Sequence, residues 1–105
     1  MLANKQALML LFIYTKFADN DYRLIKIIDR FDYPINLTEN IKILIKNDLV
    51  FVSKEGQVRE YKSNEKAETY LKRELNKPSL LEYVKLKNER GVYFQITEKL
   101  LEQIA

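Results

Sequence analysis

Apolar residues recur with a helical period over the first third of the chain, and they predict two helices there. The first is expected at 3–17, a stretch without glycine or proline in which apolar side chains lie nearly all the way round. Such a helix has to be covered on several sides. We therefore expect one face in the core and another against a second copy of the chain. After a polar loop at 19–21, apolar residues show the i, i+3, i+4, i+7 spacing of an amphipathic helix, at Leu24, Ile27, Ile28 and Phe31.

A third helix is predicted at 36–48, after a turn at Pro34, because a proline forces the preceding residue out of helical geometry. Its apolar face is expected to pack inward and consists of Leu37, Ile41, Leu44 and Ile45. The opposite face carries asparagine and lysine together with Glu39 and Ile43. That face is free to meet solvent or a ligand.

Residues 50–62 alternate between apolar and polar side chains around a short charged turn, which predicts a β-hairpin. Gly56 lies in that turn and is able to adopt a positive φ. A further amphipathic helix is expected at 65–75. Three helices, a hairpin and a following helix give an α+β fold with the element order of a winged helix-turn-helix. Residues 1–75 would form this core.

The remaining segment, 76–105, allows two interpretations. The residues from Ser79 to Glu82 have the spacing of a capping box, and Gly91 would end a helix over 80–90. Alternatively, 83–87 and 92–97 form a second hairpin, followed by a short helix. We favour the hairpin, because the strand at 92–97 otherwise lacks a partner. This extension packs on the same domain or forms a dimerisation arm, and we favour an arm built from Leu100, Leu101 and Ile104.

The hairpin region resembles the wing of MarR-type and PadR-type transcription regulators from bacteria and archaea. The resemblance covers roughly residues 5–75 and lies mainly in LysAsnAspLeuValPheVal at 46–52 and ArgGluTyrLysSerAsnGluLysAla at 59–67. In those families a helix ends in Gly-Leu-Val/Ile, and the wing leads into Tyr-x-Leu-Thr-x-x-Gly. Here the corresponding positions hold Asp48, Ser63, Asn64 and Ala67, and Asn64 is still able to cap the next helix. The resemblance implies a homodimer that binds operator DNA through the third helix and the wing.

Composition narrows the chemistry that the chain can perform. Histidine and cysteine are both absent, which removes the commonest general base, the thiolate nucleophile and the usual zinc ligands. The two glycines stand apart, so there is no glycine-rich phosphate loop. We expect neither an enzyme nor a cofactor. The apolar run at 7–14 is too short to span a bilayer, and we expect no membrane association and a cytoplasmic location.

Charge is spread evenly along the chain. The net charge of +3 comes from 18 basic and 15 acidic residues, with no basic block. A positive surface therefore has to be assembled by folding. The expected DNA contacts on the third helix are Asn36, Asn40, Lys42, Lys46 and Asn47, because asparagine can pair with adenine and lysine with phosphate or guanine. The hairpin would add contacts to the DNA backbone from Lys54, Gln57 and Arg59.

Alternatively, the same scaffold is a protein–protein interaction module that does not bind DNA. Glu39 on the outer face of the third helix would repel phosphate, and Ile43 is an unusual residue to offer to water or to bases. The even distribution of charge points the same way. An apolar patch around Ile43 would favour a protein partner.

Overall fold

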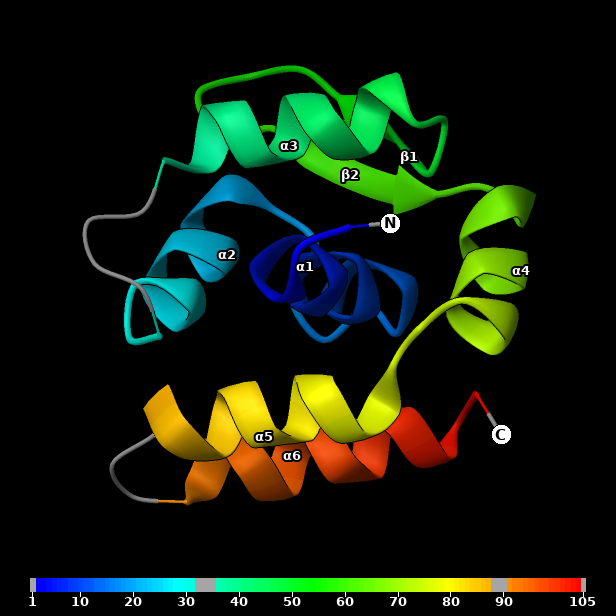
Figure 1. The fold of residues 1–105 in the computed structure, drawn as a ribbon. Coiled ribbons are helices and arrows are strands. Elements are labelled where there is room, and N and C mark those ends of the chain that lie inside the picture. The colour runs from blue at the N-terminus through cyan, green and yellow to red at the C-terminus, as the bar shows by residue number, and fades with distance from the viewer. Residues whose placement is uncertain (1, 32–35, 88–90, 105) are drawn as a thin grey trace.

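Helix α1 (Asn4–Tyr14) lies at the centre of the molecule, and the other elements surround it (Figure 1). The computed structural model describes residues 2–31, 36–87 and 91–104. Every side chain from Ala7 to Ile13 is buried, with at most 4% of its surface exposed. The chain itself therefore covers this helix on all sides. The expectation that one of its faces meets a second copy is wrong for these residues, and the homodimer itself stays a prediction.

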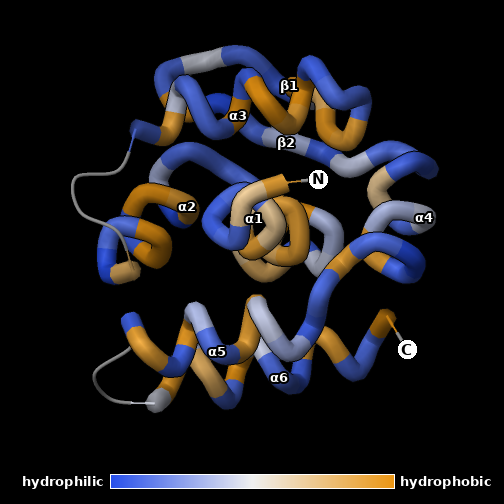
Figure 2. The backbone as a smooth tube through the Cα atoms, in the orientation of Figure 1, coloured by the Kyte–Doolittle hydropathy of each residue, from blue (hydrophilic) through white to orange (hydrophobic). Residues whose placement is uncertain are grey.

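The described elements form an α+β arrangement around α1. Figure 1 shows α3 and the hairpin on one side of α1, with α5 and α6 as a layer on the opposite side. Hydrophobic and hydrophilic residues alternate along the surrounding helices, as expected where one face is buried (Figure 2). In chain order these elements are α2 (Asp21–Ile28), α3 (Leu37–Lys46), β1 (Val50–Lys54), β2 (Glu60–Ser63), α4 (Glu65–Arg73), α5 (Lys77–Lys87) and α6 (Val92–Glu102).

The predicted helices and hairpin of the first 75 residues are confirmed, with differences in detail. Ile41 and Leu44 of α3 are buried, but Ile45, which the pattern places inward, is 39% exposed. Asn64 does not cap α4 through its side chain. Its amide instead donates to the Asp48 carbonyl oxygen and, at 3.2 Å, to the Asp48 carboxylate. Asn64 thus ties the end of α3 to the start of α4.

A short segment before α2 lies beside the hairpin. The Tyr61 N–H donates to the Asp19 carbonyl oxygen at 2.8 Å, and the Asp21 N–H donates to the Arg59 carbonyl oxygen at 3.1 Å. Asn20 forms an isolated antiparallel bridge with Glu60 between these two bonds. The loop between α1 and α2 thereby pairs with β2 on the edge that β1 leaves open.

The second hairpin predicted at 83–87 and 92–97 is wrong, because both segments are helical. Asn76 starts α5 by accepting the Ser79 N–H at 3.3 Å. Pro78 lies in the first turn, where its missing N–H is not needed. Leu80 and Val84 are fully buried one turn apart, which fits a helix better than a strand.

The dimerisation arm is also wrong as a description of the C-terminal residues. Leu100, Leu101 and Ile104 are at most 7% exposed and belong to the same hydrophobic core as α1 and α5. Gly91, which would end a helix over 80–90 in the alternative interpretation, immediately precedes α6 with a φ of 71°. The segment 76–105 therefore contributes a layer of the core.

Candidate nucleic-acid interface

The local sequence sets both ends of α3 and so fixes which face is exposed. At its start the Asn36 carboxamide oxygen accepts the Glu39 N–H at 3.1 Å, which makes Asn36 the N-cap. At its end Asp48 takes a left-handed φ of 59°, a conformation that aspartate tolerates better than most residues. The chain then turns through buried Leu49 into β1. The outer face of α3 is left beside the hairpin and away from α1 (Figure 1).

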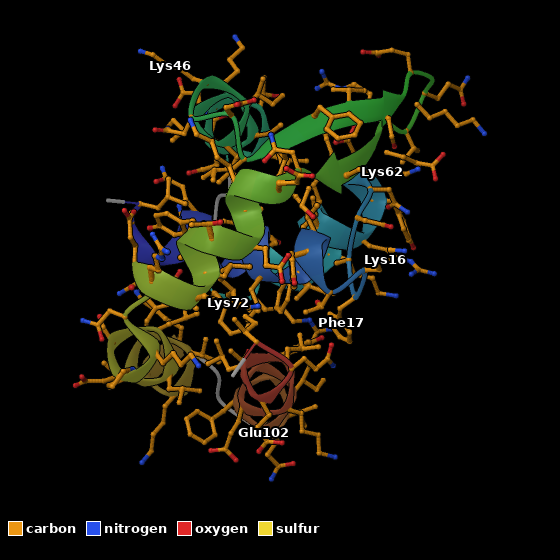
Figure 3. The ribbon with its side chains drawn as sticks, turned by 90° about the vertical axis from the view of Figure 1, so that its right-hand side faces the viewer. Lys16, Phe17, Lys46, Lys62, Lys72 and Glu102 are labelled. Carbon is orange, nitrogen blue, oxygen red and sulfur yellow. The ribbon has the colours of Figure 1, made fainter. Side chains whose placement is uncertain are left out.

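Lys42 and Lys46 are the predicted site residues that the fold leaves most available. Both are exposed, one helical turn apart. Among residues 2–31, 36–87 and 91–104, neither forms an ion pair with a carboxylate. Figure 3 shows Lys46 on the outer side of α3, pointing away from the rest of the molecule. Glu39 is also exposed on this helix and opposes their charge.

The three predicted base-reading asparagines are all engaged within the protein. Asn36 is the N-cap. The Asn40 amide donates to the Asn36 carbonyl oxygen at 2.7 Å, while its oxygen accepts a hydrogen bond from Gln6 at 3.1 Å. The Asn47 amide donates to the Ile43 carbonyl oxygen at 2.7 Å. The structure therefore does not present the asparagines as a row of free amides, and base contacts would have to use the amide hydrogens and oxygen lone pairs that these bonds leave over.

The hairpin presents only part of its predicted contact set. Lys54 is 75% exposed and lies 3.8 Å from the Glu60 carboxylate, and Gln57 is exposed in the turn. Arg59 is directed toward the start of α2, with its Nε 3.7 Å from an Asp21 carboxylate oxygen. Its backbone N–H also donates to that carboxylate at 3.1 Å. Arg59 therefore holds the hairpin to α2, and Lys54 and Gln57 remain at the tip.

Tyr61 completes this attachment from the interior. It is 1% exposed, and its hydroxyl donates to the Asp21 carboxylate. Burial raises the pKa of the Tyr61 hydroxyl above its ordinary value, and the hydrogen bond to Asp21 raises it further. The hydroxyl is therefore a permanent donor at neutral pH, and its role is structural.

A groove beside α3 was not predicted from the sequence. It has a volume of about 390 Å³ and lies between the start of α1, the second half of α3 and α4. Ile43 lines the groove and is 37% exposed. An isoleucine on the otherwise polar face of α3 was therefore the feature of the sequence that pointed to the groove. The lining residues are Leu2, Gln6, Ile43, Asn47, Leu49, Lys66, Thr69, Tyr70, Arg73 and Glu74.

Other kinds of site have no support in the part of the chain that the structure describes. No group of three or more acidic side chains there is arranged to hold a metal ion, and no helix there is long and apolar enough to cross a bilayer. Comparison of the chain with protein-family models, with curated proteins and with solved structures found no match.

Proposed function

We propose that the chain is a winged-helix protein that binds duplex DNA as a homodimer, in the control of transcription or replication. The element order supports this proposal, as does the segment at 19–21, which pairs with β2 next to the hairpin. Asp48 adds support, because its left-handed φ explains why the families that the chain resembles carry glycine at this position.

The observation that carries the proposal is the unpaired charge of Lys42 and Lys46 on the outer face of α3, next to an exposed hairpin tip. Phosphate contacts supply most of the affinity of non-specific DNA binding. Because the asparagines are engaged elsewhere, binding would depend mainly on these lysines and on Lys54. We therefore expect weak sequence preference and a strong dependence on salt.

A salt titration of duplex binding tests this function. Anisotropy of a labelled random duplex is followed between about 50 and 200 mM salt. For the double variant Lys42→Ala/Lys46→Ala, the slope of log K against log salt should become shallower by about 3.6, because the two subunits of the homodimer together lose four phosphate contacts. The matched control is Lys85→Ala/Lys99→Ala, which removes two exposed lysines from the opposite layer. Absence of binding at the lowest salt, or equal slopes for both double variants, would refute DNA binding through α3.

A dimer interface has to come from apolar residues that the fold leaves exposed. Leu86 is 77% exposed near the end of α5, and Val92 is 50% exposed at the start of α6. Both lie in the layer opposite α3 (Figure 1). Association through this end would leave the α3 helices of both copies accessible to DNA.

The groove beside α3 favours a second candidate function, a protein–protein interaction module. Its apolar lining includes Leu2, Ile43 and Tyr70, and Ile43 has no evident role in contacting phosphate. If this function is the correct one, Ile43→Glu abolishes partner binding and Lys42→Ala/Lys46→Ala does not. If α3 binds DNA, Lys42→Ala/Lys46→Ala weakens duplex binding more than Ile43→Glu does.

A further inference from the structure

The outer side of α2 and the turn after it carry a strip of two basic side chains flanked by two aromatic ones. Tyr22 and Lys26 lie one turn apart on α2, and Arg30 follows four residues later in the turn after the helix. The Lys26 ammonium lies 5.9 Å from the centre of the Tyr22 ring. The Arg30 guanidinium lies 5.8 Å from the centre of the Tyr93 ring. These contacts define the α2 strip as Tyr22, Lys26, Arg30 and Tyr93.

Tyr93 joins the strip only because the chain folds back. It belongs to α6, and its ring meets the Phe31 ring edge-on at a centroid distance of 5.4 Å. Phe31 is buried and follows α2 directly. Figure 1 shows the end of α2 and the start of α6 on the same side of the molecule. A rigid aromatic support thus underlies the Arg30 end of the strip.

The strip is accessible and its charge is largely uncompensated. Tyr22 is 64% exposed, and Arg23, Lys26 and Arg30 are all exposed. None of these three cations is ion-paired with a carboxylate of a described residue. Among the described residues, the acids nearest in the sequence are Asp21, which is committed to Arg59 and Tyr61, and half-buried Asp29. Counted over residues 2–31, 36–87 and 91–104, the outer side of α2 and the turn after it carry three cations without a carboxylate partner, and that of α3 carries two.

Cations beside an exposed aromatic ring, here Tyr22, suit one class of ligand. Proteins that bind single-stranded nucleic acid combine positive charge along the backbone with rings on which unpaired bases stack. A duplex does not offer base faces to such a ring, whereas a single strand does. Along α2, Tyr22 and Lys26 are about 6 Å apart at about 1.5 Å per residue, and Arg30 extends the strip into the turn after the helix.

We infer that the α2 strip is a binding site for single-stranded nucleic acid, separate from the face of α3. Lys26, Arg30 and neighbouring Arg23 contact phosphates, and Tyr22 stacks on a base. The inference does not rest on duplex binding by α3, because the two surfaces share no residue. It adds a second ligand to the proposed function.

The test uses labelled oligothymidylate of about 12 nucleotides, within the range that single-strand-binding folds cover. Binding to the full chain is followed by anisotropy at low salt. We expect Tyr22→Ala to weaken binding about tenfold and Tyr22→Phe to retain it, since phenylalanine keeps the stacking face. Lys26→Ala/Arg30→Ala should weaken binding further and make the salt dependence shallower. Circular dichroism checks that each variant keeps its helical content.

Two controls separate this site from the proposed one. Lys85→Ala/Lys99→Ala should leave oligothymidylate binding unchanged. Lys42→Ala/Lys46→Ala should weaken binding of the random duplex more than binding of oligothymidylate, and Lys26→Ala/Arg30→Ala should do the reverse. The inference is overturned if oligothymidylate does not bind, or if Tyr22→Ala and Lys26→Ala/Arg30→Ala have no effect. It is also overturned if these variants weaken only a random duplex, because the strip then serves as a duplex backbone contact.

Discussion

Replacing Tyr61 with phenylalanine tests how firmly the hairpin is attached to α2. The ring is buried beneath the hairpin, so phenylalanine keeps the packing and loses only the hydroxyl that donates to Asp21. A hydrogen bond to a charged group contributes about 1.5–3 kcal/mol. Asp21 keeps the Arg59 N–H as a partner at 3.1 Å, and its side chain is 20% exposed. We therefore expect a loss near the middle of that range, about 2 kcal/mol.

Urea unfolding at neutral pH, followed by circular dichroism, measures this loss. For a domain of this size, about 2 kcal/mol corresponds to a decrease in Tm of about 8 °C. Tyr22→Phe is the matched control, because it removes a hydroxyl from a ring that is 64% exposed. Its effect should stay within about 0.5 kcal/mol, as is usual for surface substitutions. If Tyr61→Phe is as stable as Tyr22→Phe, the hydroxyl does not hold the hairpin in place.

Three further predictions concern the pKa of Tyr61, the N-cap of α3 and the exposed end of α5. The pKa of the Tyr61 hydroxyl is raised in the folded state, so this hydroxyl stays protonated there above about pH 10. In the unfolded chain the same hydroxyl ionises near pH 10. The wild-type protein should therefore lose stability above about pH 10. The advantage of wild type over Tyr61→Phe in urea midpoint should accordingly shrink between about pH 9 and 11, and a constant advantage would contradict this. Asn36→Ala should cost about 1 kcal/mol by removing the N-cap of α3, and an unchanged urea midpoint would exclude that role. Leu86→Lys should shift the protein to the monomer in light scattering after gel filtration, and a dimer that survives at equal concentration would place the interface elsewhere.

The elements of residues 1–75 could be predicted because their signals are local. Helical periodicity and the turn around Gly56 depend on neighbours in sequence, whereas the turn predicted at Pro34 lies outside the described residues. At 76–105 the same signals were ambiguous, since Tyr83, Val84 and Leu86 fit an alternating pattern as well as a helical one. Pro78 fits a break after the helix at 65–75 and the first turn of a new helix equally well.

The mistake at 76–105 also explains the mistake about α1. A helix that is apolar all round needs cover, and sequence alone does not say whether its own chain or a second copy supplies it. Once α5 and α6 are helices, they form the layer that covers the side of α1 left open by α3, α2 and α4. Leu100 and Leu101 are then needed inside the chain and are not left for a dimer.

The exposure of the lysines in the candidate site could be predicted from the sequence, but the hydrogen bonds of its asparagines could not. The periodicity placed Lys46 on the outer face of α3 and Lys42 at its side, and both are exposed. Asn40 and Asn47 were expected to be free, but side-chain amides bind carbonyl groups one turn back when these are within reach. Such bonds depend on rotamers, which no pattern of residue types reveals.

The positions of unpaired cations link the two proposed surfaces. Arg59 and Lys54 look like hairpin contacts in the sequence, yet each lies near a carboxylate in the fold, at 3.7 Å and 3.8 Å. Asp21 in particular attracts Arg59 and so keeps it from a ligand, while the cations further along α2 have no ion-pair partner in the part of the chain that the structure describes. An Asp21→Asn substitution should therefore weaken the attachment of the hairpin and free Arg59 for phosphate, so that stability falls while affinity for nucleic acid rises. Opposite signs in these two measurements would show that the ion pair at the base of the hairpin sets how much positive charge the protein presents.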